Sequence, residues 1–189
     1  MRHRQVHALL FFMLLAAMLV PTFAGCKPPH AETNSSRLQP NTSTPTPHPN
    51  KAPDFTLPTL QGTTITLSQI EGKPVVLVFW ATWCPYCRIQ LRYLEAAARQ
   101  ENQKNVMFLA VNVGETKAKM ENFFAEYKPA MIVALDETRA VFNEYNSRFH
   151  NPGYMPITFF IDSEGVVQQV RIGAFANEAE LWNNLDELS

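Results

Sequence analysis

Hydrophobic residues from about position 52 onward gather in short runs that are separated by polar turns. Two of these runs, Val75–Trp80 (VVLVFW) and residues 106–113 (VMFLAVNV), are apolar on both alternating faces. This pattern is typical of strands that are buried on both sides of a sheet. Apolar residues at helical spacing between the two runs predict a helix from Cys84 to about Gln103. A strand, a helix and a second strand in this order predict parallel pairing of the two strands.

The remaining apolar segments are shorter and extend this core on both sides. Residues 55–57 and 63–67, around the turn at 61–62, predict an N-terminal hairpin that is followed by a helical turn at 68–70. The later segments alternate between helical and extended patterns: helix 116–127, strand 131–135, helix 138–145, strands 158–161 and 166–172, and helix 177–188. This order predicts an α/β fold, a three-layer α/β/α sandwich around a mixed central sheet, with a central helix–strand insertion.

The first 25 residues have the pattern of an export signal. Arg2 and Arg4 precede an apolar run at residues 8–20, which is too short to span a membrane but typical of a signal-peptide core. The run leads to FAGC at residues 23–26, which resembles the lipobox of bacterial lipoproteins, where the cysteine is acylated and becomes the new N-terminus. We therefore expect residues 1–25 to be a lipoprotein signal peptide and Cys26 to be lipidated. Ordinary signal cleavage, with Cys26 left as a spare thiol, is the alternative.

Residues 26–51 consist mainly of Pro, Thr, Ser and Asn and contain almost nothing that can be buried in a core. Such a stretch predicts an extended tether, since Pro-rich chain spans up to about 3.1 Å per residue. We expect the tether to hold a folded domain, residues 52–189, outside the cytoplasm, on the periplasmic face or the cell surface. The lipid on Cys26 would then be the attachment to the membrane.

The charge balance of the chain bears on whether it binds nucleic acid. The chain has 189 residues, with 16 Lys and Arg against 17 Asp and Glu and a net charge of −1. The basic residues form no stripe along the sequence, so we expect no nucleic-acid partner. A domain of about 140 residues buries enough surface to fold without disulfides or a structural metal. Lipidation of Cys26 accounts for one of the three cysteines, which leaves the other two free for chemistry.

The sequence WCPYC at residues 83–87 lies where a buried strand ends and a helix begins, the setting in which a Cys-x-x-Cys pair is typically redox-active. Cys84 falls at the helix N-terminus, where free backbone N–H groups stabilise a thiolate, so we expect Cys84 to be the nucleophile. Cys87, one turn later and facing inward, is expected to resolve the mixed disulfide. Pro85 stiffens the turn, while Trp83 and Tyr86 place aromatic surface beside the sulfurs.

Other uses of the cysteine pair stay open. One is a purely structural disulfide, although so short a loop constrains little of the unfolded chain. Another is a Cu(I) site with two thiolate ligands, because soft thiolates select that ion. A structural zinc site needs four ligands, and the domain adds only His150 to the two cysteines. The redox use of the pair stays our expectation, with no resident metal and no cofactor, and the Cu(I) site is the alternative.

Longer motifs extend over the whole domain: PDF at 53–55, VFWATWC at 78–84, AVNVGE at 110–115, and MPITFFID at 155–162 followed by Glu164 and Gly165. Together they resemble the thioredoxin superfamily, and in particular its membrane-tethered TlpA/ResA-like thiol-disulfide oxidoreductases. The resemblance runs to the C-terminal helix and implies a thioredoxin fold. It also implies that residues 116–145 form the extra helix and strand that distinguish this branch.

The resemblance further implies site residues and partners. Met155 and Pro156 are expected to form a cis peptide beside the sulfurs, with Met155 pairing with an extended substrate segment and Pro156 discouraging metal capture by the thiols. A transmembrane thiol-disulfide carrier is implied as electron donor. Apocytochrome c or another disulfide-containing exported protein is implied as substrate. We expect Trp83 on the exposed rim where substrate binds and Trp80 in the core.

Two positions depart from the pattern of this superfamily. Thioredoxins have a buried Asp where this chain has Val78, and ResA-like proteins often have a Glu where it has Gln90. Such carboxylates manage the proton of the inner cysteine, so another group must do so here. Glu115 is a candidate, although a solvated loop acid is the simpler interpretation. His150 is a candidate for lining the substrate groove.

These observations predict an extracytoplasmic thiol-disulfide oxidoreductase that reduces disulfides in exported proteins through a Cys84–Cys87 dithiol/disulfide couple. An oxidase or isomerase of the same fold would use the same sulfurs in the opposite direction. A peroxiredoxin shares the PDFTL opening at 53–57 but needs a Pro-x-x-x-Thr-x-x-Cys setting that this chain lacks. A copper-binding and delivery module is the alternative from another class, although its family typically carries Cys-x-x-x-Cys.

Overall fold

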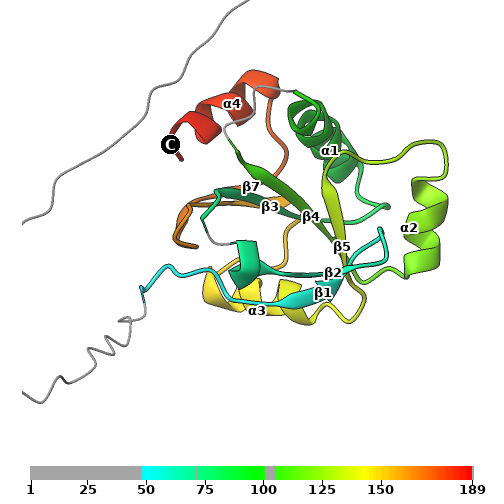
Figure 1. Ribbon diagram of the computed structural model, residues 1–189, viewed down its shortest axis with the longest axis horizontal. Helices are drawn as coiled ribbons and strands as arrows, with labels where there is room; N and C mark the ends of the chain where they lie inside the picture. The colour runs from blue at the N-terminus through cyan, green and yellow to red at the C-terminus, as the bar shows by residue number, and fades with distance from the viewer. Residues whose placement is uncertain (1–47, 71, 101–104, 189) are drawn as a thin grey trace, which may run out of the picture. The chain divides into compact units, whose positions relative to one another are not determined.

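The computed structural model describes residues 48–70, 72–100 and 105–188 (Figure 1). The expected signal peptide (1–25), the lipidation site Cys26 and all but the last four residues of the expected tether (26–51) lie outside these ranges, so they remain predictions. No helix within the described ranges is long and apolar enough to cross a membrane.

The centre of the fold is a mixed sheet of five strands in the order β5-β4-β3-β6-β7. β3 (Val75–Trp80) pairs in parallel with β4 (Met107–Val113), and β4 in parallel with β5 (Ile132–Asp136). On the other side β6 (Ile157–Ile161) pairs antiparallel with β3, and β7 (Val167–Ile172) antiparallel with β6. The central place of β3 explains why its sequence is apolar on both faces, because all six of its residues are buried.

Alternate residues of β3 face two separate hydrophobic layers. The layer that contains Val78 and Trp80 is closed by α1 (Pro85–Ala98), α2 (Lys117–Phe123) and α4 (Glu178–Asp186). Figure 1 shows α1 and α4 together on one side of the sheet. The first turn of α1 leaves the carboxyl end of β3, so this layer positions the cysteine pair against the sheet.

The opposite layer is built from α3 (Ala140–Arg148) and the N-terminal hairpin, β1 (Thr56–Pro58) with β2 (Thr64–Thr66). A 3-10 helix (Leu67–Ile70) follows the hairpin, as the sequence predicts for this segment. Figure 1 shows α3 and the hairpin on the side of the sheet away from α1. The predicted three-layer sandwich, the mixed sheet, the N-terminal hairpin and the central helix–strand insertion are all confirmed.

Two helices end four or five residues earlier than their sequences predict. α1 ends at Ala98 rather than near residue 103, because Ala97 is the last side chain buried against the core and the polar residues after it have no apolar face. α2 ends at Phe123 rather than at residue 127, and its cap Phe124 already leaves helical geometry at φ −100° and ψ 15°. Phe123, Phe124 and Tyr127 form an aromatic stripe in the sequence that predicts core packing for all three, but Tyr127 is 44% exposed.

Candidate active site

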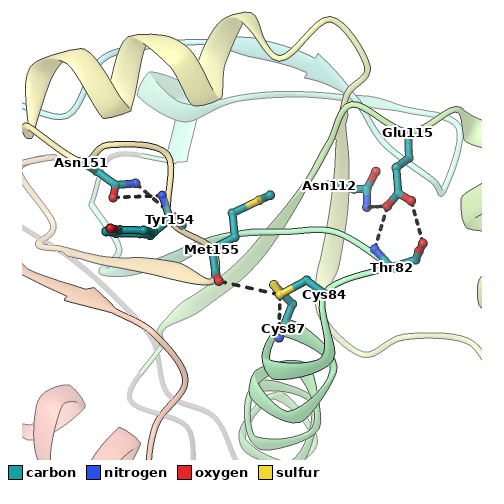
Figure 2. The surroundings of a disulfide bond; sticks show 8 residues. All are labelled: Thr82, Cys84, Cys87, Asn112, Glu115, Asn151, Tyr154 and Met155. Carbon is teal, nitrogen blue, oxygen red and sulfur yellow. Dashed lines mark hydrogen bonds between the residues drawn. A yellow bond between two sulfur atoms is a disulfide. The ribbon is translucent and has the colours of Figure 1, made fainter.

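The two cysteines are joined by a disulfide on the first turn of α1, with their Cα atoms 5.2 Å apart (Figure 2). Cys84 is the N-cap residue of the helix, and Pro85 takes the first helical position, where its missing N–H is not needed. The backbone N–H of Cys87 points at Cys84 Sγ, with N and Sγ 3.1 Å apart. A thiolate at Cys84 would accept the same N–H and the positive end of the helix dipole.

Exposure differs sharply between the disulfide and its surroundings. Cys87 is fully buried and Cys84 is 5% exposed, so an attacking group can reach the pair only at Cys84. Around it lie three large aromatic side chains that are each more than half exposed, Trp83, Tyr86 and Tyr154. Trp80 is fully buried, which confirms the expected division between a core tryptophan and a rim tryptophan.

Met155 and Pro156 are joined by a cis peptide bond, as expected. The carbonyl oxygen of Met155 lies 3.7 Å from Cys84 Sγ, so the backbone before the proline is beside the reactive sulfur (Figure 2). A groove opens at this point between α1 and the β7–α4 connection; it is lined by Tyr86, Ile89, Tyr93, Met155, Pro156 and residues 173–176. His150 is exposed at the end of α3 and is not among these lining residues.

Asn151 holds the loop that presents Tyr154 and Met155, a role that the sequence did not indicate. Its side chain is buried; Oδ1 accepts from the Tyr154 N–H at 3.2 Å, and Nδ2 donates to the Tyr154 carbonyl oxygen at 3.1 Å. Nδ2 also donates to Asn146 Oδ1 on α3 at 2.6 Å. The amide therefore ties the segment before the cis proline to α3; Figure 2 shows its two bonds to Tyr154.

The two positions that lack an acid are occupied by buried neutral side chains. Val78 and Gln90 are both fully buried. Gln90 Nε2 donates to Thr158 Oγ1 at 3.0 Å, and its Oε1 accepts from the Phe175 N–H at 2.9 Å. Gln90 thus joins α1 to β6 and to the β7–α4 connection through two hydrogen bonds. It has no proton to exchange at neutral pH.

Glu115 is not the solvated loop acid that the sequence favoured. Its side chain is only 3% exposed, and both oxygens are turned toward the loop before Cys84. Oε2 accepts from the Thr82 N–H at 2.7 Å and from Asn112 Nδ2 at 2.8 Å; Oε1 accepts from Thr82 Oγ1 at 2.6 Å and pairs with Lys119 Nζ at 2.5 Å. Gly114, at φ +73°, allows the chain to turn so that this carboxylate points back into the fold.

The hydrogen bonds to Glu115 determine its charge state. Burial alone raises the pKa of this carboxyl group, but the bonds from Asn112, Lys119 and Thr82 outweigh burial and lower the pKa to about 2. Figure 2 shows the cysteine pair between Met155 on one side and the Thr82, Asn112 and Glu115 network on the other. The carboxylate is therefore a fixed anchor for the Thr82–Cys84 loop. It is not a base for the proton of Cys87 at neutral pH.

The chemistry open to this site is a two-electron exchange between thiols and a disulfide. Among residues 48–70, 72–100 and 105–188, no group of three or more His, Cys, Asp and Glu side chains is placed to hold a metal ion. The cysteine pair forms a disulfide at the start of a helix, directly after a buried strand. This arrangement assigns the protein to the class of thioredoxin-like thiol-disulfide oxidoreductases.

Comparison with known proteins places the chain in a particular family of this class. Residues 49–170 match the AhpC/TSA family. The thiol-disulfide oxidoreductase ResA of Geobacillus kaustophilus (strain HTA426) is 37% identical over 127 residues, covering 67% of this chain and 70% of that protein. The chain therefore belongs to the AhpC/TSA family and, within it, to the ResA-like thiol-disulfide oxidoreductases.

Solved structures agree with this assignment. A putative thiol:disulfide interchange protein DsbE from Chlorobium tepidum superposes with a TM-score of 0.64 at 28% identity, over 74% of this chain and 95% of that one. The pneumococcal exposed lipoprotein thioredoxin Etrx1 from Streptococcus pneumoniae strain TIGR4 gives a TM-score of 0.61 at 27% identity, over 72% of this chain and 100% of that one. These matches confirm the thioredoxin-like fold.

Proposed function

We propose that the protein is a lipid-anchored, extracytoplasmic reductase of disulfides in exported proteins, with Cys84 as the nucleophile and Cys87 as the resolving thiol. The observation that carries the proposal is the asymmetry of the pair. Cys84 caps α1 and lies beside the Met155 carbonyl, whereas Cys87 is sealed from solvent. Only Cys84 is placed to meet an external disulfide.

The exchange has two steps. The Cys84 thiolate attacks one sulfur of the target disulfide, a mixed disulfide forms, and the second target sulfur leaves as a thiolate. The Cys87 sulfur then attacks Cys84 Sγ, closes the internal disulfide and releases the first target sulfur. The target gains two electrons and the protein loses two. A dithiol donor, which we propose to be a transmembrane thiol-disulfide carrier, reduces the pair again.

The proton of Cys87 needs an acceptor in the second step. Val78 and Gln90 supply none, and Glu115 is held ionised by four donors with a pKa of about 2. The departing thiolates of the target are the remaining strong bases at the site. We propose that they take the proton, so resolution is coupled to product release.

The surroundings of Cys84 fit an extended polypeptide. The Met155 backbone can pair with such a segment, and the groove beside Tyr86, Ile89 and Pro156 can hold an apolar side chain next to the target cysteine. The exposed rings of Trp83, Tyr86 and Tyr154 offer further apolar contact. Unfolded exported proteins, apocytochrome c among them, present segments of this kind.

The lipid anchor is proposed on the FAGC motif at residues 23–26 and the Pro-rich stretch that follows it. A structural relative at 27% identity, Etrx1, is itself described as an exposed lipoprotein. Metabolic labelling with a radioactive fatty acid tests the anchor: label is expected on the wild type and absent from Cys26→Ala. Label that persists in Cys26→Ala would refute lipidation at this residue.

The direction of electron flow is tested by the reduction potential of the Cys84–Cys87 pair, measured by equilibration with thiol-disulfide buffers of known potential. A value of about −200 mV or lower supports a reductase, whereas a value near −120 mV would make the protein an oxidant. Cys84→Ser is the control, because it removes the intramolecular couple. A pair that binds Cu(I) tightly but shows no reversible couple would favour the copper-delivery alternative.

A further inference from the structure

A second groove lies along α1 on the side that faces α2. It is lined by Arg88, Leu91, Arg92, Glu95, Ala96 and Arg99 from α1 and its end, together with Phe123 and Tyr127. Its lining shares no residue with the groove beside the cis proline. The two grooves therefore flank the helix that carries the disulfide, and only one of them is used by the function proposed above.

The charge of this second groove is positive. Glu95 is the one acidic residue in its lining, and its carboxylate already has partners. It pairs with Arg99 and accepts a hydrogen bond from the Ala130 N–H at 2.8 Å. Arg88 and Arg92 are exposed, and within the described ranges neither takes part in an ion pair. Two like charges at i and i+4 on a helix destabilise it. Because the nearby Glu95 is already engaged by Arg99 and Ala130, the two guanidinium groups are left available to an external anion.

The walls of the groove favour a polypeptide over a small ion. Tyr127 is 44% exposed and lies with Phe123 opposite the arginines, so the cleft offers both aromatic surface and guanidinium donors. From Arg88 to Arg99 the helix rises about 16 Å, the length of about five extended residues. Arg88 directly follows Cys87, so the groove begins beside the disulfide. A protein already engaged at Cys84 could extend an acidic segment into it.

We propose that this arginine groove binds an acidic segment of the protein that exchanges disulfides at Cys84. The proposal rests on the proposed function and adds a class of partner to it: polypeptides with Asp or Glu near the reactive cysteine. Guanidinium forks on Arg88 and Arg92 bind the carboxylates, and Phe123 and Tyr127 contact the intervening side chains. Charge of this kind acts mainly on the rate of encounter and on the choice of partner.

The first experiment measures disulfide exchange of the reduced protein with three peptides that differ only beside the disulfide, in a run of Glu, Gln or Lys. Each arginine is expected to contribute about two- to fivefold to the preference for Glu over Gln. The preference should disappear between about 20 mM and about 500 mM salt, where the screening length falls from about 20 Å to about 4 Å. Arg88→Gln/Arg92→Gln should lose the preference and keep the rate with the Gln peptide. That rate separates charge recognition from any change in thiol reactivity.

Arg148→Gln is the matched control, since Arg148 ends α3 in the layer on the other side of the sheet. It should keep the full preference for the Glu peptide. A double variant that still prefers the Glu peptide, or a wild type with no preference at low salt, would overturn the proposal.

The second experiment makes the groove testable apart from the redox function. A cysteine-free acidic peptide is titrated into the wild type and the double variant by calorimetry, because this binding needs no exchange. Peptide binding that is lost in the double variant supports the groove even if no disulfide exchange occurs. Binding without exchange would refute the proposed function and leave the groove proposal standing. If the peptide does not bind but anionic vesicles do, in a way that needs Arg88 and Arg92, the groove is a lipid-headgroup site and the acidic-partner proposal is wrong.

Discussion

Replacement of Glu115 by Gln tests whether a buried carboxylate anchors the active-site loop. The change keeps the size of the side chain and removes its charge. An amide presents one oxygen, whereas the carboxylate uses two oxygens to accept from Thr82, Asn112 and Lys119. At least one of these donors must lose its partner, or face an N–H₂ group, in the variant.

The size of the effect follows from the pKa of the carboxyl group. The native structure lowers it from 4.5 to about 2, and at about 1.4 kcal/mol per unit this corresponds to about 3 kcal/mol of stability. Lys119 is 53% exposed, so solvent screens part of that interaction and we expect about 2 to 3 kcal/mol. Because the folded-state pKa is lowered, this stability is present above pH 4.5 and is lost as the pH falls toward about 2.

The assay is urea unfolding of wild type and Glu115→Gln, both with the disulfide closed, at a series of pH values. The difference in the free energy of unfolding should be about 2 to 3 kcal/mol at pH 7 and should shrink as the pH falls from 4.5 toward 2. Glu121→Gln is the control, because Glu121 is 56% exposed and its ion pair within the described part of the chain is with Lys117 at 3.6 Å; a change below about 0.5 kcal/mol is expected. A Glu115→Gln protein as stable as wild type at pH 7, or a deficit independent of pH, would refute the anchor.

Two further substitutions probe the site. Gln90→Glu buries a carboxyl group without a cation, so its pKa should rise. Its cost to stability relative to wild type should then grow as the pH increases above about 4.3, and a cost that falls with pH would contradict this. Asn151→Ala removes three hydrogen bonds that hold the segment before Met155. It should lose about 1 to 3 kcal/mol in denaturant unfolding and slow disulfide exchange; unchanged exchange would mean that the loop keeps its position without the amide.

The sheet and the cysteine pair could be predicted from sequence because their signals are local. β3 is apolar on both faces since two layers cover it, and its predicted limits match the observed strand. The placement of Cys84 at a helix start followed from the strand before it and the proline after it. Each of these inferences needs only neighbours in the chain.

The parts that sequence reasoning missed depend on distant neighbours. Glu115 follows a glycine in a loop, and nothing near it in sequence shows that Thr82, 33 positions earlier, donates two hydrogen bonds to it. Asn151 acquires its role only because α3 brings Asn146 beside it. Tyr127 fits the helical spacing of a core residue, yet α2 ends at Phe123 and leaves the ring at the surface.

The most direct test of the central claim compares the single-cysteine variants Cys87→Ser and Cys84→Ser in reaction with a disulfide-containing peptide. Cys87→Ser should accumulate a mixed disulfide that mass spectrometry maps to Cys84, with release of one peptide thiol. Cys84→Ser should form almost none at residue 87, because Cys87 is fully buried. Equal reaction at both positions, or no mixed disulfide on Cys84, would contradict the assignment of Cys84 as nucleophile and Cys87 as resolving thiol.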